Sequence, residues 1–331
     1  MRCAVVGAGA WGTALADLLA RNGHDVSLWA REPEVIESVN TIHENTTFLA
    51  GAKLDAGVVA EPDLATACRG AALVLFATPS HVLRAIARSA APAVEAGATI
   101  VVATKGVERE TLAVMSDVLA EQFPRHAVVA LSGPSFAAEV VARQPTAVVA
   151  ASASSGAAAM VQHALSGDEF RVYTHDDVVG VELGGALKNV IAVATGIAEG
   201  LGMGFNARAA LITRGLAEMT RLGVKMGASP LTFAGLAGMG DLVLTCTGAL
   251  SRNRSLGVEI ARGVSLDEAL AKRQTVAEGV MTTHSARALA AREGIEMPIV
   301  SAVYGILFDH QPPRAAIGEL MRRELRAEGD T

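Results

Sequence analysis

The sequence predicts an α/β fold, with an N-terminal Rossmann-like, doubly wound and mostly parallel sheet and a C-terminal all-α domain. In the first half of the 331 residues, short apolar runs alternate with helical stretches, as in parallel sheets covered by crossover helices. From about residue 176 onward, apolar residues recur at helical spacing and strand-like runs stop. We therefore expect a first domain over residues 1–180 and a second over residues 181–331.

The predicted strands are short runs of mostly valine, leucine, isoleucine and alanine. They cover residues 2–6, 26–29, 73–77, 99–103, 128–131 and 147–150. A helix after the first strand should end near Asn22, because Gly23 suits the left-handed cap position. An almost wholly apolar helix is expected from 178 to 197, and glycine and proline predict later breaks at 227–230, 235–240 and 297–298.

The composition argues against several classes of protein. A net charge of −6 gives no reason to expect a nucleic acid partner. The longest apolar run, residues 71–77, is far shorter than the roughly 20 residues of a membrane span. The chain enters a strand directly after Met1, which leaves no room for a signal peptide. Three unpaired cysteines fit a reducing, cytoplasmic setting, and no Cys/His cluster at ligand spacing indicates a metal site.

A GxGxxG pattern at residues 7–12 follows the first strand and opens a helix. In this context the pattern is typical of dinucleotide binding: Gly7 and Gly9 let the backbone turn and approach the pyrophosphate, and Gly12 allows helix and strand to pack closely. The alternative is an ordinary turn between a strand and a helix. The pattern predicts a nicotinamide dinucleotide cofactor.

The end of the second strand bears on which dinucleotide is used. An acidic residue there accepts a hydrogen bond from the ribose 2′-hydroxyl of NAD, whereas an arginine can neutralise the 2′-phosphate of NADP. The chain has Arg31 at this place and Glu32 one residue later. We expect NADP(H) to be preferred and NAD(H) to be accepted; a solvated surface charge is the alternative for Arg31.

The second half carries polar residues that packing alone does not explain well. Lys188 lies in the apolar helix beside paired glycines, which could leave room for a ligand. Asp241 follows a glycine-rich turn, and the segment 251–255 gathers hydrogen-bond donors at an expected helix start. Each has a plain alternative: a snorkelling lysine, a helix cap and a solvated face.

Hydride transfer to the carbonyl of a phosphorylated substrate requires a cation, a carboxylate and phosphate-binding donors, which are the residue types found here. Negative charge develops on the carbonyl oxygen, and a nearby ammonium such as Lys188 can stabilise that charge and supply a proton. Asp241 could orient the ammonium or accept from a substrate hydroxyl. A helix start with Ser251, Arg252 and Asn253 suits a phosphate group. Lys105, which follows a predicted strand, would be a second cation at the sheet's ligand-binding edge.

At this point the chain resembles a known family, the bacterial-type NAD(P)-dependent glycerol-3-phosphate dehydrogenases. The resemblance covers essentially the whole chain in order. It rests on GAGAWGTALA (7–16), WAR (29–31), ATPS (77–80), TKG (104–106), LSGPSFAAEV (131–140), VELGGALKNVIAVATGI (181–197), GMGDLVLTCTG (238–248), SRNR (251–254) and VAEGV (276–280).

The resemblance implies reduction of dihydroxyacetone phosphate to sn-glycerol 3-phosphate for phospholipid synthesis, with Lys188 as the general acid/base. It implies a small phosphorylated three-carbon substrate and three sets of site residues. The catalytic set is Lys188, Lys105, Asp241 and Thr245; the substrate set is Lys105, Gly133, Ser135, Lys188, Asp241, Ser251, Arg252 and Asn253; the cofactor set is Gly7, Gly9, Ala10, Trp11, Gly12, Arg31, Lys105, Ala137, Arg252, Val276 and Glu278.

Some positions depart from the family pattern, and two other functions stay open. Ala10 stands where many members have serine, and Phe48 and Ala50 weaken the match of one loop. A dehydrogenase of the β-hydroxyacid or ketopantoate type would not need both Lys105 and the Ser251–Asn253 segment. A redox sensor that binds NADP(H) without turnover would not need a catalytic lysine. Apolar segments of the helical domain could bury against a second subunit, so a homodimer is one expected assembly.

Overall fold

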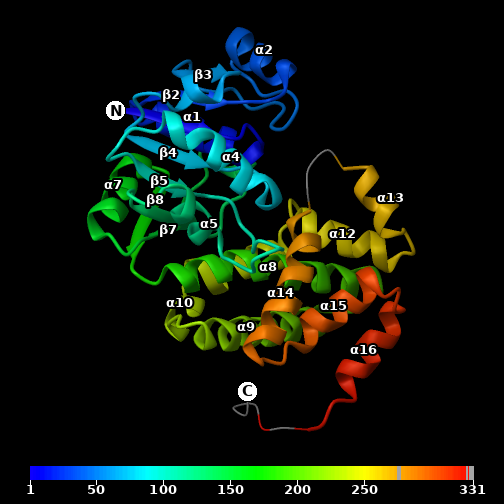
Figure 1. The fold of residues 1–331 in the computed structure, drawn as a ribbon. Coiled ribbons are helices and arrows are strands. Elements are labelled where there is room, and N and C mark those ends of the chain that lie inside the picture. Colours follow the sequence, from blue (N-terminus) through cyan, green and yellow to red (C-terminus); the bar gives the residue numbers. More distant parts are fainter. Residues whose placement is uncertain (274–276, 326, 328–331) are drawn as a thin grey trace. The chain divides into compact units, whose positions relative to one another are not determined.

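The computed structural model describes residues 1–273, 277–325 and 327. Its chain divides into two compact units (Figure 1). The first comprises residues 1–105 and 114–182, and the second comprises residues 106–113 and 183–331. The first contains a sheet with helices, and the second is helical, which confirms the predicted fold class.

The first unit is built on an eight-stranded sheet with the order β3-β2-β1-β4-β5-β6-β7-β8. Only the β6–β7 pairing is antiparallel, so the sheet is mostly parallel, as predicted. The strands are β1 (Arg2–Val6), β2 (Asp25–Trp29), β3 (Val58–Glu61), β4 (Leu73–Phe76), β5 (Thr99–Val102), β6 (Val128–Ser132), β7 (Thr146–Ala151) and β8 (Phe170–His175).

The predicted runs missed β3 and β8. Both lie at an edge of the sheet, where one face and one side of a strand are open to water. In β3, Val59 is exposed between buried neighbours, and in β8 exposed Arg171 and Tyr173 alternate with buried Phe170 and Val172. The apolar run of β3 covers only residues 58–60, and β8 alternates apolar and polar residues, so neither strand has the longer apolar run by which the central strands were predicted.

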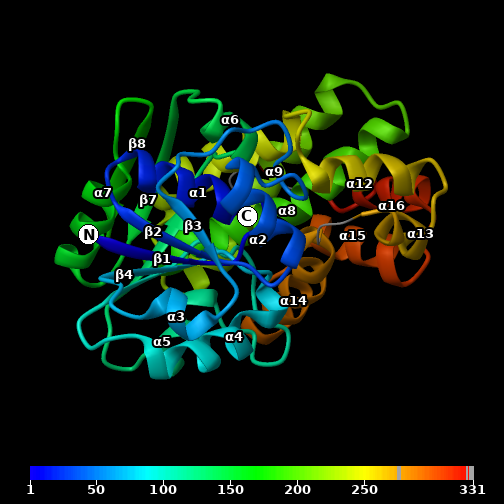
Figure 2. The same ribbon diagram turned by 90° about the horizontal axis from the view of Figure 1, so that it is seen from above.

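Helices cover both faces of the sheet (Figure 2). On one face lie α1 (Ala10–Arg21), α6 (Ala137–Val141) and α7 (Ser155–Leu165), and on the other α3 (Leu64–Cys68), α4 (Leu83–Ala90) and α5 (Met115–Gln122). Helix α2 (Pro33–Ile42) packs on β3, and short 3₁₀ turns span Ser80–Val82 and Ala91–Ala93. The buried side of α1, including Leu15, Leu18 and Leu19, packs into a core that the strands share.

The strand order reverses between β1 and β4, which places a ligand-binding edge there. Val6, the last residue of β1, is in register with Trp29 on one side and Phe76 on the other. The backbone continues in step, because Gly7 N donates to Trp29 O at 3.2 Å and Ala77 N donates to Val6 O at 2.9 Å. The glycine-rich turn thus begins at the carboxyl ends of the central strands.

The second unit consists of helices packed on α8 (Val178–Gly200), whose first turn belongs to the first unit. The others are α9 (Phe205–Lys225), α10 (Pro230–Ala234), a π-helical turn η3 (Leu236–Gly240), α11 (Asp241–Thr247), α12 (Arg252–Ala261), α13 (Leu266–Ala271), α14 (Glu278–Glu293), α15 (Pro298–Phe308) and α16 (Pro313–Met321). The break predicted at 235–240 is found at Gly235, where the backbone is extended, and it is narrower than predicted because η3 runs directly into α11.

Helix α8 is the central helix of this unit. By length and composition it could cross a membrane, yet 89% of its most apolar window is buried within the protein, as in the core helix of a globular domain. Glycines let other backbones approach it closely: a Cβ on Gly196 would lie 2.0 Å from Arg254 O, and one on Gly200 would lie 2.7 Å from Val258 O. Helix α12 can therefore cross α8 with backbone against backbone.

Candidate functional site

The three glycines of the first turn have three different roles. Gly7 has φ +114°, a conformation that side chains rarely adopt. A Cβ on Gly12 would lie 1.9 Å from Gly7 O, so the turn needs glycine there to close. A Cβ on Gly9, by contrast, would meet no atom within 4 Å. Backbone conformation therefore explains Gly7 and packing explains Gly12, whereas at Gly9 the open space suits a bound group that approaches the backbone.

The start of α1 has the properties of an anion-binding helix end. Its N-cap residue, Gly9, offers no side-chain cap, and its first turn carries no acidic residue. The backbone N–H groups and the positive end of the helix dipole are thus left to a ligand. Nε1 of Trp11 is buried without a hydrogen-bond partner among the described residues, which also fits a polar group bound nearby. These features fit the pyrophosphate of a dinucleotide.

Three predicted substrate residues converge at the ends of β5 and β6. Nζ of Lys105 donates to Gly133 O at 3.2 Å, and Oγ of Ser135 donates to the same oxygen at 3.0 Å. Gly133 has φ +144°, and a Cβ there would lie 2.9 Å from the Val148 Cα, so β7 requires glycine at this position. One backbone carbonyl thereby holds an ammonium and a hydroxyl together. Ala137, predicted to contact the cofactor, is the first residue of α6.

Arg31 lies just beyond β2, as predicted, and is solvent-exposed. Its side chain is 82% exposed, and its guanidinium forms an ion pair with Glu32 at 2.9 Å. The carboxylate that could recognise a ribose hydroxyl is therefore already engaged by the arginine that could recognise a phosphate.

The second unit brings Lys188, Asp241 and Thr245 together. Nζ of Lys188 donates to Oδ1 of Asp241, and both side chains are buried, the carboxylate completely. Oγ1 of Thr245 donates to Asp241 O at 2.6 Å, one turn back along α11. Taking both charges out of water costs free energy that their attraction offsets only in good geometry, so such pairs are more typical of function than of stability.

Close packing of η3 on α8 brings this pair together. A Cβ on Gly184 would lie 2.5 Å from Ala237 O and 3.4 Å from Gly238 Cα, both in η3. Gly184 therefore makes room for the π-helical turn that precedes Asp241, which corrects the expectation that it leaves room for a ligand. π-helical turns are rare and are often found at functional sites.

The remaining predicted residues of this unit lie at the start of α12 and beside it. Oγ of Ser251 caps the helix by accepting from Arg254 N at 3.2 Å. The amide of Asn253 is held within the protein: Nδ2 donates to Asn189 Oδ1 at 2.9 Å, and Oδ1 accepts from Gly279 N at 3.0 Å. Burial lowers the pKa of Arg252, and the negative charge of Glu278, the first residue of α14, opposes that shift. Val276 lies outside the described residues.

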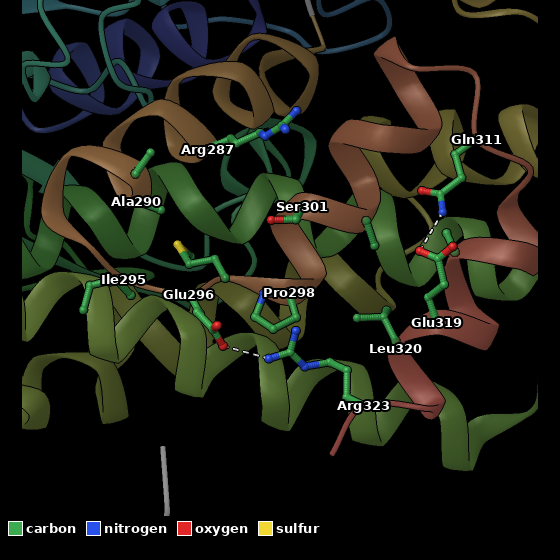
Figure 3. A pocket seen from close by; sticks show the side chains of 14 residues that line it. Arg287, Ala290, Ile295, Glu296, Pro298, Ser301, Gln311, Glu319, Leu320 and Arg323 are labelled. Carbon is green, nitrogen blue, oxygen red and sulfur yellow. Dashed lines mark hydrogen bonds and ion pairs between the residues drawn. The ribbon is translucent and has the colours of Figure 1, made fainter. Parts of the chain in front are cut away.

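A cavity of about 450 Å³ lies among α14, α15 and α16 (Figure 3). Its wall carries the ion pair of Glu296 with Arg323 and the hydrogen bond from Gln311 to Glu319. None of the predicted site residues that the structure describes lines this cavity. In the part of the chain that the structure describes, no group of three or more His, Cys, Asp or Glu side chains could hold a metal ion.

Sequence reasoning missed Asn45 and Thr13, whose side chains both bond to the glycine-rich turn. Nδ2 of Asn45 donates to Ala8 O and to Thr13 Oγ1, each at 2.8 Å. Nothing in the spacing of residues 13 and 45 could have revealed this contact, because it depends on how the loop after α2 folds back. For Thr13, the only available signal was a polar side chain among small apolar residues in the predicted helix, and that signal does not indicate a partner.

Comparisons with known proteins agree with this geometry. The family model described as NAD-dependent glycerol-3-phosphate dehydrogenase N-terminus matches residues 2–158, and the corresponding C-terminus model matches residues 177–318. A glycerol-3-phosphate dehydrogenase [NAD(P)+] of Geobacter sp. (strain M21) is 55% identical over 331 residues, or 99% of each chain. One of Geobacter metallireducens is 53% identical over 98% of each chain.

A solved structure is similar over nearly the full length as well. The crystal structure of glycerol-3-phosphate dehydrogenase from Coxiella burnetii has a TM-score of 0.94 and 40% sequence identity, and the match covers 97% of this chain and 99% of that one. The N-terminal and C-terminal halves of the chain thus match the N-terminal and C-terminal models of the same enzyme family. The chain belongs to the family of NAD-dependent glycerol-3-phosphate dehydrogenases.

Proposed function

We propose that this protein catalyses the reversible, NAD(P)H-dependent reduction of dihydroxyacetone phosphate to sn-glycerol 3-phosphate, which supplies glycerophospholipid synthesis. The observation that carries the proposal is the buried pair of Lys188 and Asp241. In the proposed mechanism, Lys188 donates a proton to the substrate's carbonyl oxygen and takes it back in the reverse reaction. Asp241 orients the ammonium, and Thr245 holds the backbone of Asp241 in place.

The bound nicotinamide would supply the hydride, and the protein would hold and orient the dinucleotide. We assign this role mainly to residues 1–180 and substrate binding mainly to residues 181–331, and each part also supplies some contacts for the other role. The proposed cofactor contacts are Gly7, Gly9, Ala10, Trp11, Gly12, Arg31, Lys105, Ala137, Arg252, Val276 and Glu278. Because Arg31 is exposed and Glu32 is already paired with it, we propose that NADP(H) is preferred to NAD(H).

The substrate's phosphate distinguishes this function from its rivals. We propose that the start of α12 binds it, where Arg252 follows the capping residue Ser251. Lys105, Gly133, Ser135 and Asn253 complete the proposed substrate contacts. A carboxylate substrate such as ketopantoate would have no use for a phosphate site in addition to Lys105, and a sensor without turnover would have no use for a buried Lys–Asp pair.

Consumption of NADPH at 340 nm tests the proposal, with dihydroxyacetone phosphate compared against ketopantoate and tartronate semialdehyde. Only the first should be reduced efficiently. Lys188→Ala should lower kcat by about 10²- to 10⁴-fold, the usual contribution of general acid catalysis, with little change in the Kd for NADPH. Lys225→Ala, at an exposed lysine in the last turn of α9, is the control and should leave kcat unchanged.

Two results would contradict the proposal. Efficient reduction of ketopantoate or tartronate semialdehyde, without reduction of dihydroxyacetone phosphate, would show that the protein acts on a different substrate. Retained turnover in Lys188→Ala would remove Lys188 from the mechanism. We place the enzyme in the cytoplasm on the strength of its metabolic role, and the homodimer stays a prediction.

A further inference from the structure

Asn45 is a completely buried amide in the loop between α2 and β3. Its Nδ2 donates to Ala8 O at 2.8 Å and to Thr13 Oγ1 at 2.8 Å, and its Oδ1 accepts from Phe48 N at 3.0 Å. Ala8 lies between Gly7 and Gly9 of the glycine-rich turn. Although Asn45 lies 32 residues beyond Thr13 in the sequence, its side chain therefore forms a hydrogen bond directly to the backbone of the glycine-rich turn.

The hydrogens of this network balance. Asn45 Nδ2 has two hydrogens and uses one for Ala8 O and one for Thr13 Oγ1. The hydroxyl of Thr13 has a single hydrogen, which it donates to Ala8 O at 3.2 Å, while its oxygen accepts from Asn45. Ala8 O thus receives two hydrogen bonds from two different elements, which fixes the direction of the carbonyl.

This fixed carbonyl also fixes the next N–H group. The peptide between Ala8 and Gly9 is planar and trans, so its C=O and N–H point in opposite directions. With Ala8 O held on the side of Asn45 and Thr13, the N–H of Gly9 is directed to the other side. Gly9 is also the glycine at which a Cβ would meet no atom, so its surroundings leave room for a ligand.

The loop that carries Asn45 is itself well anchored. Its two ends are joined by the Glu44–Lys53 bridge and by a hydrogen bond of 2.8 Å from Leu54 N to His43 O. Leu49 and Leu54 are buried in the core of the first unit. The loop therefore holds Asn45 at a defined place, as a positioning group must be held.

We propose that Asn45, with Thr13, is a positioning residue of the cofactor site, which presents the Gly9 N–H to the pyrophosphate of the bound dinucleotide. It acts through the carbonyl of Ala8 and does not itself touch the ligand. The inference rests on the proposed function, because it takes a dinucleotide as the ligand of this turn.

Asn45→Asp tests the proposal, because it keeps the shape and the acceptor for Phe48 N but replaces the donating NH₂ by an oxygen. Repulsion from Ala8 O should turn the peptide and raise the Kd for NADPH, measured by its fluorescence, on the order of tenfold to a hundredfold. At saturating NADPH, kcat and the KM for dihydroxyacetone phosphate should stay near the wild-type values.

Asn22→Asp is the matched control. Asn22 is the C-cap of the same helix α1, and its Nδ2 also donates to two backbone carbonyls, Ala164 O at 2.9 Å and Ser166 O at 3.2 Å. The control makes the same change of charge and of hydrogen bonding at the opposite end of the helix. Its Tm should fall, while its Kd for NADPH should stay within about twofold of the wild type.

A second pair of variants is free of added charge. Thr13→Val removes one of the two donors to Ala8 O and should raise the Kd for NADPH several-fold, whereas Thr13→Ser keeps the hydroxyl and should restore it. This pair decides the matter if Asn45→Asp does not fold. An unchanged Kd in Asn45→Asp or, where that variant is unfolded, in Thr13→Val would overturn the inference. Failure of the wild-type protein to bind NADPH or NADH would instead overturn the proposed function.

Discussion

Helices α1 and α15 begin in opposite ways. At the start of α15, the N–H groups of Ile299 and Val300 donate to the carboxylate of Glu218 at 2.7 and 3.3 Å. Glu218 comes from α9 and is buried. At the start of α1, the N-cap is Gly9, no side chain caps the helix and no acidic residue lies in the first turn. Each start has backbone N–H groups without helical partners and a positive dipole end, although Pro298 at the start of α15 has no N–H. Only α15 has an anion from the protein there.

The difference separates structural anions from ligand anions. Glu182, buried in the first unit, follows the α15 pattern, because Ser116 N at the start of α5 donates to it at 2.9 Å. These carboxylates join one helix to the start of another. Where the protein supplies no anion and Gly9 leaves the approach open, the anion should come from the ligand.

The largest effect should come from Gly9→Ala. Its backbone, with φ −65° and ψ 174°, suits alanine, so the ligand-free protein should keep its stability or gain up to about 1 kcal/mol. The new methyl group would occupy the place where the pyrophosphate meets the backbone. We expect the Kd for both NADPH and NADH to rise by about a hundredfold or more, measured by fluorescence titration.

Gly12→Ala is the contrasting variant, because its methyl group would lie 1.9 Å from Gly7 O. It should lower the free energy of unfolding by about 1–3 kcal/mol or more through overpacking. If Gly9→Ala instead loses stability and keeps its cofactor affinity, the two glycines have the same structural role and the comparison of helix starts fails.

The same contrast explains how much could be predicted from sequence. The glycine-rich turn was predicted because its residues lie within six positions and follow a strand, so local spacing carries the information. Lys188 and Asp241 are 53 residues apart, and their pairing depends on η3 packing against Gly184, which no local pattern encodes. The two residues were singled out as polar groups beside glycines, and the family resemblance then implied their roles. Glu218 and Glu182 were not identified, because a glutamate in a helix usually faces solvent.

Glu218→Gln should give the next largest effect, and it concerns stability rather than binding. Burial raises the pKa of Glu218 to about 7, although its bonds from Ile299 and Val300 oppose the shift. The folded state therefore holds a proton that the unfolded state has released between pH 4.5 and 7, and stability falls as the pH rises through this window. The loss attributable to this group approaches about 3 kcal/mol.

Urea unfolding at pH 5 and pH 8 measures this slope. Glu218→Gln should make the difference between the two pH values smaller than in the wild type, and a residual slope of the same sign should come from Glu182, whose pKa burial also raises to about 7. Cofactor affinity should not change. An unaltered slope, or a loss of NADPH binding, would contradict a purely structural role for the anion at the start of α15.

The smallest effect should come from Arg31→Ala, and it separates two ways of binding phosphate. The start of α1 would bind the pyrophosphate that NADPH and NADH share, whereas Arg31 would bind only the 2′-phosphate of NADPH. Its side chain is 82% exposed and paired with Glu32, so solvent and the carboxylate weaken its contribution. We expect the NADPH/NADH ratio of kcat/KM to fall about tenfold, with Arg31→Lys falling less because it keeps the charge. An unchanged ratio would show that Arg31 is a solvated surface charge. Of the two groups compared here, the backbone at the start of α1 alone would then bind a phosphate of the cofactor.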